Sequence, residues 1–477
     1  MNQQQTPLFD ALEQHAKKRP QSMHVPGHKY GQVFPSKGYS YFHKILEIDA
    51  TELTGLDDLH QPEGVILESE ALLADLYGVN KSYFLVNGST VGNLAMIFAA
   101  CSHNDTVLVQ RNSHKSILNG LQMAGVKPIF LTPTYDREVQ VASYVTFNTV
   151  REAFEKFHNI KAIILTSPNY YGMVNQLELS KIITYAHEMG TAVLIDEAHG
   201  AHFMLEGFPA SALAIGADIV VHSAHKTLPA MTMGSYLHVN SSIIDPEEVE
   251  YYLRILQSSS PSYPIMASLD LARNYLATIQ KNGTNTIIDK LIGFTQRMNE
   301  IPQIKIVTSK NKDVQTDLLK LTVQSQCELN GYQLQSVFEE IGIYTEMADP
   351  NNVLFVLPLI ENFDADEIIT KVSHALRKYK PIKGQFKDLD YGANSISTLD
   401  LCYNEIKRYN KEVVSFQEAI GSISAEMIIP YPPGIPIMME GERVTERHIE
   451  VLNTYIQTGA HFQGGDMVKK LIKILQT

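Results

Sequence analysis

Two side chains that could do chemistry follow short apolar runs of the sequence. Lys226 follows the run ADIVVH (217–222), and it is either a solvated lysine at the end of a strand or an amine presented to a ligand. Asp196 ends the run TAVLID (191–196), where a buried carboxylate is costly unless a cation meets it. That cation could be the protonated nitrogen of a pyridine ring or a nearby arginine or lysine.

The residues after a third run are suited to hold a phosphate. Gly88, Ser89 and Thr90 follow SYFLV (82–86) and begin a helical pattern. The start of a helix offers free N–H groups and the positive end of the helix dipole, and the two hydroxyls add donors. An ordinary Ser/Thr helix cap is the alternative interpretation.

Histidines near these positions are further candidates. His114 follows DTVLVQ (105–110), and its imidazole could stack on a flat ring or be an ordinary polar loop residue. His199 and His202 come shortly after Asp196, which groups side-chain types that bind metals. No further ligand cluster accompanies them, and the three cysteines are too dispersed for a CxxC site or a disulfide framework, so we expect no metal.

Together, the residues after these runs supply the parts of one site: a phosphate cradle, a stacking imidazole, a carboxylate for a ring nitrogen and an amine. Ser223 and His225 flank Lys226 and could hold a phosphate while Lys226 forms a Schiff base. Pyridoxal 5'-phosphate (PLP) requires these groups, because the protein orients that cofactor and the cofactor accepts the electrons. We therefore expect PLP, with Lys226 as its Schiff-base lysine.

An α/β scaffold would bring the ends of these runs together. From about residue 65 to 280, short apolar runs alternate with helical periodicity, which predicts a mostly parallel sheet covered on both faces. Ligands of such sheets bind outside the carboxyl ends of the strands. We expect four parts: an N-terminal arm (1–50), a large PLP-binding domain (51–280), a smaller α/β domain (281–378) and a C-terminal α+β domain (379–477). In the last part we expect a helix near 400–420 and another in GDMVKKLIKIL (465–475).

The composition excludes several classes of protein. The chain has 477 residues, of which 44% are apolar and 19% charged, and this balance is typical of globular proteins. Its net charge of −13, from 39 basic and 52 acidic residues, argues against nucleic acid as a partner. The start is not of signal-peptide type, and no run of eighteen apolar residues occurs. We therefore expect a soluble protein of the reducing cytoplasm, with no membrane partner.

The order of the motifs GST, SHK, DEAH and SAHK resembles that of fold-type I PLP enzymes, and the chain resembles the ornithine/lysine/arginine decarboxylase family in particular. The resemblance runs from about residue 20 to the C-terminus and implies an aspartate-aminotransferase-like fold. Its further motifs are PGHKYG (26–31), DATELTGLDDLHQPEG (49–64), SPNYYG (167–172), QSSSPSY (257–263) and PYPPGIP (430–436).

The resemblance implies a role for each matching position of the cofactor site. Asp196 matches the partner of the pyridine nitrogen, His114 the histidine that stacks on the ring, and Ala198 the residue under the ring. The positions that match phosphate-holding residues are Ser89, Thr90, Ser223 and His225, next to Gly88 at the start of the helix.

Other motifs imply contacts with a partner subunit and with the substrate. Ser258 and Ser259 of QSSSPSY would reach the neighbouring subunit's site in a homodimer with shared active sites, which could assemble further. Glu426 is a candidate to meet the distal cationic end of the substrate, and a solvated carboxylate is the alternative. LDDLH and PGHK are either tight turns at the dimer interface or direct substrate contacts.

The chain differs from other members of this family in two respects. Other members commonly have a tryptophan three residues after the aspartate, where this chain has His199. The large members also carry an N-terminal receiver-like domain, for which this chain is too short. The chain thus resembles the shorter, biosynthetic-type branch, and the choice among arginine, lysine and ornithine stays open.

The reaction that the resemblance implies is decarboxylation of a basic amino acid to CO2 and an amine, a di- or polyamine precursor. Asp196 would keep the ring nitrogen protonated, the apolar stretch TLPAMTMGS (227–235) would keep the site dry, and Lys226 or His199 would protonate Cα. One alternative is a PLP-dependent aminotransferase or lyase, although no arginine stands in the context that grips an α-carboxylate. The other is a non-catalytic PLP-fold binding protein, against which the intact set of residues argues.

Overall fold

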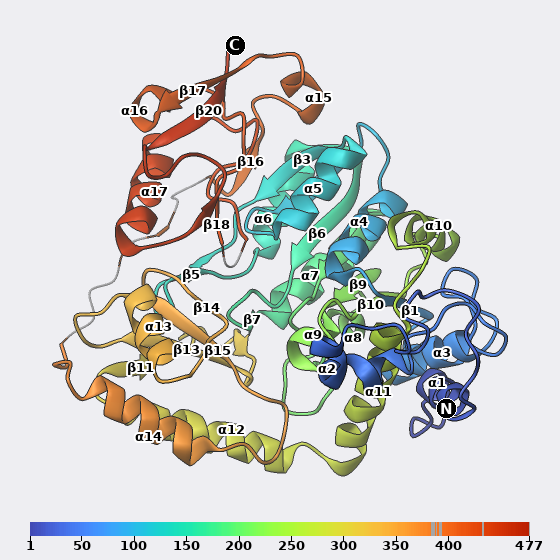
Figure 1. Cartoon of the computed structure of the whole chain (residues 1–477). Coiled ribbons are helices and arrows are strands. Elements are labelled where there is room, and N and C mark those ends of the chain that lie inside the picture. Colours follow the sequence, from blue (N-terminus) through green and yellow to red (C-terminus); the bar gives the residue numbers. More distant parts are fainter. Residues whose placement is uncertain (383–386, 388, 391–393, 432–433, 477) are drawn as a thin grey trace. The chain divides into compact units, whose positions relative to one another are not determined.

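The computed structural model describes residues 1–382, 387, 389–390, 394–431 and 434–476, so Pro432 and Pro433 of PYPPGIP lie outside the described residues. The chain forms two compact units. Unit 1 consists of Met1–Ala100 and Ala192–Thr284, and unit 2 of Cys101–Thr191 and Asn285–Thr477. Each unit contains helices packed on strands (Figure 1).

Unit 1 contributes four strands in the order β1-β10-β9-β8. Their bounds are β1 Lys81–Leu85, β8 Ala192–Asp196, β9 Ile219–His222 and β10 Ser235–Val239. Strands β8 and β9 are parallel, whereas β10 runs antiparallel to both β9 and β1. Every residue of β8, β9 and β10 is buried, as expected of apolar strands covered on both faces.

Helix α4 (Gly88–Ala100) packs across all four of these strands. Gly92 permits this close approach, because a Cβ at that position would lie 2.7 Å from Leu85 Cδ1 and 2.9 Å from Val221 Cγ1. The remaining helices of unit 1 are α1 (Pro7–Lys17), α2 (Ser36–Leu46), α3 (Val65–Tyr77), α8 (Ala212–Ile215), α9 (Ala224–Thr227), α10 (Pro246–Leu256) and α11 (Tyr263–Asn282).

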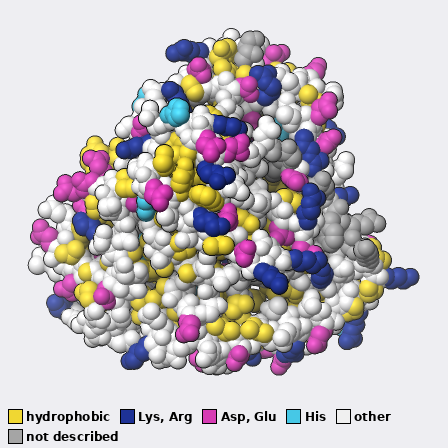
Figure 2. Space-filling view, turned by 180° about the vertical axis from the view of Figure 1, so that it is seen from behind, with side chains coloured by type: hydrophobic (Ala, Val, Ile, Leu, Met, Phe, Trp, Pro, Cys, Tyr) yellow, Lys and Arg dark blue, Asp and Glu magenta, His cyan; other side chains and the backbone are white. Residues whose placement is uncertain are grey.

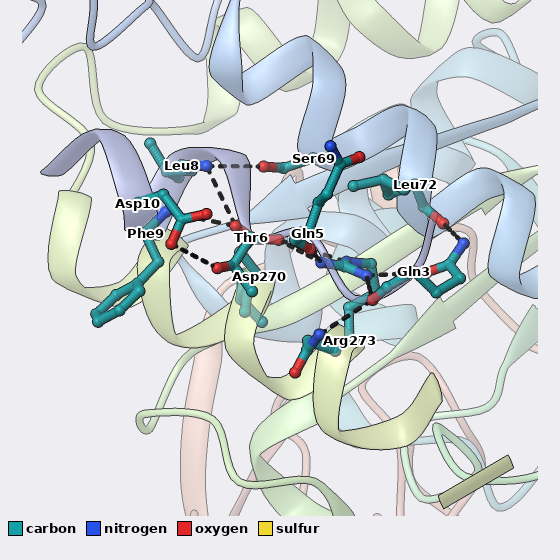
Figure 3. Close-up of polar contacts among 12 residues, drawn as sticks. Gln3, Gln5, Thr6, Leu8, Phe9, Asp10, Ser69, Leu72, Asp270 and Arg273 are labelled. Atoms are coloured by element: carbon teal, nitrogen blue, oxygen red, sulfur yellow. Dashed lines mark hydrogen bonds and ion pairs between the residues drawn. The ribbon is translucent and has the colours of Figure 1, made fainter. Parts of the chain in front are cut away.

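The N-terminal segment is held on α11 by a buried ion pair (Figure 3). Arg273, which is fully buried, donates to Asp270 Oδ1 at 2.9 Å and to the carbonyl oxygen of Gln3 at 2.9 Å. Asp270 Oδ2 in turn accepts the N–H groups of Leu8 and Phe9, at 3.2 and 3.4 Å. Since these N–H groups begin α1 and have no partner within that helix, Asp270 caps it.

Unit 2 contributes a second group of strands in the order β6-β2-β3-β16. Strands β2 (Thr106–Gln110), β3 (Lys127–Leu131) and β6 (Ile160–Thr166) are parallel, and β16 (Ile396–Thr398) is antiparallel to β3. Helices α5 (Lys115–Ala124), α6 (Phe147–Lys156) and α7 (Gln176–Glu188) connect or follow them. Two strand pairs are also present: β4 (Tyr135–Asp136) with β5 (Val141–Ala142), and β7 (Met173–Val174) with β12 (Gln315–Thr316).

A separate antiparallel sheet of unit 2 follows residue 285, in the order β11-β13-β15-β14. The strands are β11 (Ile304–Ile306), β13 (Lys320–Ser325), β14 (Met347–Ala348) and β15 (Asn352–Val356). Its helices are α12 (Asn285–Met298), α13 (Gly331–Glu340) and α14 (Ala365–Leu376).

The C-terminal part of unit 2 differs from the expectation. The helix predicted near 400–420 is wrong: the structure has the single turns α15 (Tyr403–Ile406) and α16 (Phe416–Ala419) with strand β17 (Lys411–Ser415) between them. The helix predicted in GDMVKKLIKIL is also wrong, because β20 (Leu471–Leu475) pairs antiparallel with β17. Ile472 and Ile474 are buried while Lys473 between them is half-exposed, which is the two-residue period of a strand. The other elements here are α17 (Glu446–Thr458), β18 (Ile429–Pro430) and β19 (Phe462–Gln463).

Among the described residues, no helix is both long and apolar enough to cross a membrane. On the face shown in Figure 2, acidic and basic side chains are interspersed, and no single basic patch of the kind that binds nucleic acid dominates it.

Candidate active site

The Asp196 carboxylate lies at the carboxyl end of β8 in a nearly dry environment. Its side chain is 3% exposed. Oδ2 accepts a hydrogen bond from Asn93 Nδ2 at 3.1 Å, and Oδ1 accepts one from the N–H of Ala198 at 3.3 Å. Burial raises the pKa of Asp196, and the opposing effects of the Lys226 charge and of the Asn93 hydrogen bond do not cancel it. The carboxylate is therefore suited to a cationic partner such as a ring N–H.

Lys226 lies beside His199, with 3.0 Å between Lys226 Nζ and His199 Nε2. The lysine is in the single turn α9, directly after β9, and the histidine is in the turn directly after β8. These two turns are connected, because the Ser223 N–H donates to the Ala198 carbonyl oxygen at 3.2 Å. The neighbouring parallel strands thus place an amine, an imidazole and a carboxylate at one edge of the sheet.

The hydroxyls assigned to the phosphate also meet. Ser223 Oγ donates to Ser89 Oγ at 2.7 Å, at the start of the 13-residue helix α4. Gly88 begins that helix with a φ of +80°, a conformation that side-chain-bearing residues rarely adopt. Thr90 is exposed on the same turn. His225 is half-buried, and its Nδ1 lies 3.1 Å from the Gly234 carbonyl oxygen.

His114 belongs to unit 2 and lies after the carboxyl end of β2. It is the N-cap residue of α5, and its Nδ1 accepts the Ser116 N–H at 3.3 Å. The PYPPGIP segment packs against it: a Cβ at Gly434 would lie 3.2 Å from His114 Cδ2, and the Lys115 N–H donates to the Gly434 carbonyl oxygen at 3.2 Å. The imidazole is therefore held between Ser116 of its own helix and Gly434 of PYPPGIP.

The QSSSPSY segment contacts Asn87 of its own chain, next to the start of α4. Ser258 and Ser259 are exposed. The Ser258 N–H donates to Asn87 Oδ1 at 3.2 Å, next to Gly88, and His60 Nε2 is 2.8 Å from the Ser258 carbonyl oxygen. A contact of Ser258 and Ser259 with a second subunit stays a prediction.

The LDDLH motif forms a tight turn around the Asp57 carboxylate. Asp57 accepts the N–H groups of Glu63, Gly64 and Ile66 at 2.9, 2.8 and 3.0 Å. These bonds hold the pKa of Asp57 below its ordinary value, against the opposing and individually largest effect of burial. Asp57 thus fixes the start of α3, while a substrate contact by this motif stays a prediction. In PGHK, His28 Nε2 lies 3.0 Å from Asp49 Oδ2.

Glu426 lies in the C-terminal part of unit 2 and already has a cationic partner. Its Oε1 accepts the Lys473 N–H at 2.8 Å, and its Oε2 lies 3.6 Å from Lys473 Nζ. A role in binding the distal end of the substrate would require the carboxylate to exchange this lysine for the substrate. The stretch TLPAMTMGS is not an apolar cover within the chain, because Met231 and Met233 are 41% and 44% exposed.

The sequence interpretation missed two features of these units. Asn93, a lone amide on an apolar helix, is the donor to Asp196, and its polarity on a buried face was the available signal. Unit 2 also contains a cavity of about 530 Å³, lined among others by Tyr170 of SPNYYG and by Ile435 and Pro436 of PYPPGIP. The SPNYYG and PYPPGIP motifs thus contribute to the wall of one cavity.

The residues of unit 1 fit PLP. A dry carboxylate, a lysine amine and a hydroxyl pair at a helix start are the groups that the pyridine nitrogen, the aldehyde and the phosphate require. Among the described residues, no group of three or more metal-ligand side chains is suitably placed to hold a metal ion.

Comparison with known proteins agrees with this assignment. Residues 6–326 match the family described as Orn/Lys/Arg decarboxylase, major domain, and residues 393–465 match Orn/Lys/Arg decarboxylase, C-terminal domain. The chain is 47% identical to "Uncharacterized protein YaaO" of Bacillus subtilis over 98% of this chain and 97% of that one. It is 31% identical to "Arginine decarboxylase" of Bacillus anthracis, over 100% of this chain and 98% of the relative.

A solved structure confirms the fold class. The constitutive lysine decarboxylase of E. coli superposes with a TM-score of 0.79 over 99% of this chain and 82% of that chain, at 20% identity. The expected fold-type I architecture and the expected cofactor, PLP, are confirmed. The chain belongs to the Orn/Lys/Arg decarboxylase family and is a PLP-dependent amino-acid decarboxylase.

Proposed function

We propose that this chain decarboxylates a basic amino acid, arginine, lysine or ornithine, to CO2 and the corresponding di- or polyamine precursor. The observation that carries the proposal is the placement of Lys226 Nζ 3.0 Å from His199 Nε2, in a turn bonded to the turn that holds Asp196. The family match and relatives named arginine decarboxylase and lysine decarboxylase support the substrate class.

In this proposal each residue has a distinct task. Bound PLP supplies the electron sink for the pair left when CO2 departs. Lys226 binds the cofactor through its amine, and Asp196 accepts the hydrogen bond of the ring N–H and so keeps the ring nitrogen charged. Ser89 and Ser223, with Gly88, Thr90 and His225, hold the phosphate at the start of α4, while His114 stacks on the ring and Ala198 lies beneath it.

The Lys226–His199 pair returns a proton to the substrate Cα. The 3.0 Å distance lets the two nitrogens share a proton, so either can donate it once the carboxylate has left. The half-buried position of Lys226 beside the buried His199 limits access of water to that proton.

The proposal includes a homodimer in the cytoplasm. Ser258 and Ser259 are exposed next to the phosphate cradle, where they are free to meet a partner subunit's site. Glu426 is proposed to meet the distal cation of the substrate after displacing Lys473. The three cysteines of the chain are free thiols, as suits a reducing compartment.

The test is CO2 release from arginine, lysine and ornithine by the PLP-loaded protein, with the amine product identified. We expect stoichiometric CO2 and amine from one of the three, without keto acid. Keto-acid formation would favour the aminotransferase alternative. Tight PLP binding without turnover of any of the three would favour a non-catalytic binding protein.

A further inference from the structure

Four buried polar side chains form a hydrogen-bonded row across the strands of unit 1. Ser82 on β1 lies opposite His238 on β10, with its Oγ 2.8 Å from His238 Nδ1. His238 Nε2 is 3.1 Å from Nδ1 of His222, the last residue of β9, and His222 Nε2 is 2.9 Å from Glu197 Oε1. The four residues are at most 4% exposed. None of them has a task in the proposed chemistry.

The distances along this row fit a chain of hydrogen bonds in which each member donates to the next, from Ser82 to Glu197. Glu197 Oε2 accepts the N–H of Ala212 at 2.7 Å, so the carboxylate is an acceptor at both oxygens. His222 then donates from Nε2 and accepts at Nδ1 from His238 Nε2, and His238 accepts at Nδ1 from the Ser82 hydroxyl. His238 is neutral in this arrangement. Burial holds the pKa of His238 well below its ordinary value, which agrees with a neutral ring.

The row ends at the two turns that carry the candidate active site. Glu197 directly follows Asp196, and His222 directly precedes Ser223. The Glu197–His222 hydrogen bond therefore joins the turn of Asp196 to the turn of Lys226. The Glu197 N–H strengthens this junction, because it donates to the Val221 carbonyl oxygen at 3.0 Å.

The packing around the row permits little rotation of its members. Tyr77 of α3 lies over His238 and His222, with ring centroids 4.4 and 5.3 Å away, and its hydroxyl donates to the Ala201 carbonyl oxygen at 2.5 Å. Gly200 packs closely against the Glu197 side chain, because a Cβ at Gly200 would lie 2.5 Å from Glu197 Cγ.

We propose that the Ser82–His238–His222–Glu197 row is a positioning device that fixes the Asp196 and Lys226 turns relative to each other for PLP binding. A buried polar row is a costly way to fill a sheet face that apolar side chains could fill, and its benefit is one defined arrangement of the groups that it joins. The inference rests on the PLP site of the proposed function and assigns positioning roles, chiefly to Glu197 and His222.

Two substitutions of one residue separate positioning from simple packing. In His222→Gln the amide nitrogen replaces Nε2 and still reaches Glu197. In His222→Asn the shorter amide replaces Nδ1 and still meets His238, but it leaves Glu197 without its donor. Both variants are polar and close in size, and both keep the site residues unchanged, so they are matched controls for each other.

The measurements are the PLP dissociation constant of the apo-protein, the visible absorbance of lysine-bound PLP and the thermal midpoint of the apo-protein. We expect PLP affinity close to wild type in His222→Gln and a loss of about tenfold in His222→Asn, with an altered absorbance band, because only the latter loses the bond to Glu197. A tenfold loss corresponds to about 1.4 kcal/mol. Ser82→Ala, at the far end of the row, should weaken PLP binding less than His222→Asn.

Equal PLP affinity in the Gln and Asn variants would overturn the proposal, whatever happens to their thermal midpoints. If His222→Asn does not fold, the comparison of His222→Gln with Glu197→Met gives the same test, because methionine has no oxygen to accept the hydrogen bond from His222. PLP binding is measured without substrate. Failure to decarboxylate any basic amino acid would therefore count against the proposed function but would not affect the test of the positioning role.

Discussion

Asp196→Asn tests whether the Asp196 carboxylate is kept for PLP binding and not for stability. The substitution should raise the free energy of unfolding of the apo-protein while it weakens PLP binding. Asp196 is 3% exposed, and burial raises its pKa above the ordinary value of 3.8. A raised pKa means that the ionised form costs stability at neutral pH, about 1.4 kcal/mol per pKa unit. An asparagine removes that charge, and rotation of the Asn93 amide lets it accept from the new NH2 group. We therefore expect a higher free energy of unfolding for the variant apo-protein at pH 7.

The same substitution should weaken PLP binding, because asparagine offers the ring N–H a neutral acceptor in place of a charged one. A hydrogen bond to a charged group is worth about 1.5–3 kcal/mol, which corresponds to about 10- to 150-fold in the PLP dissociation constant. The assay is PLP titration of the apo-protein followed by visible absorbance, with chemical denaturation of the same sample. CO2 release should fall with the affinity and should remain low at saturating PLP, since the ring nitrogen is no longer held protonated.

The pH dependence of the free energy of unfolding tests independently whether ionised Asp196 destabilises the apo-protein. A group with a raised folded-state pKa contributes stability that is complete below its unfolded pKa, here about 3.8, and is lost as the pH rises through the folded-state pKa. Wild-type apo-protein should lose this contribution across that window, and Asp196→Asn should not. A variant that is less stable at pH 7 and binds PLP as tightly as wild type would refute this account of Asp196.

Four further predictions follow from single contacts. Lys226→Ala should abolish both CO2 release and the visible absorbance of lysine-bound PLP, and retention of either would contradict its assignment. Gly434→Ala should lower kcat/KM without loss of fold, because a Cβ there would lie 3.2 Å from His114 and the φ of +95° disfavours it; an unchanged kcat/KM would separate His114 from the reaction. Arg273→Met should cost about 3–5 kcal/mol in chemical denaturation, since it leaves a buried carboxylate without its cation, and a loss below about 1 kcal/mol would show that the N-terminal segment is held otherwise. Burial raises the pKa of Glu70 to about 8, so wild type should lose stability as the pH rises through 8 and Glu70→Gln should flatten that part of the profile; parallel profiles would refute it.

The ends of strands β8 and β9 could be predicted because each strand carries its own sequence signal. Continuous apolar runs such as TAVLID and ADIVVH fit a strand buried on both faces, and polar residues directly after them fall at the ligand-binding edge. Ser223 and Ser89 are 134 residues apart, yet their hydroxyls meet as expected from this rule. The order of the strands and their parallel type were sufficient to predict that Ser89 and Ser223 lie together.

The errors and omissions arise where pairing partners decide the structure. LIKIL is compatible with either a helix or a strand, and only its pairing with KEVVS determines that it is β20. The row from Ser82 to Glu197 depends on the register of β1, β10 and β9, which no local pattern contains. Judged by their sequence neighbours alone, His222 and His238 are isolated histidines in buried strands.

A buried carboxylate alone does not identify the site. Asp270 is fully buried, but Arg273 of the same chain neutralises it at 2.9 Å, and together they hold α1. Asp349 is buried too, and it accepts the Tyr171 hydroxyl and the amides that follow it. Asp196 differs from both because its donors are two amides and its turn is bonded to the turn of Lys226, the proposed PLP lysine. Asp270 has an ion-pair partner at hydrogen-bond distance, whereas burial outweighs the nearby Lys226 charge and raises the pKa of Asp196.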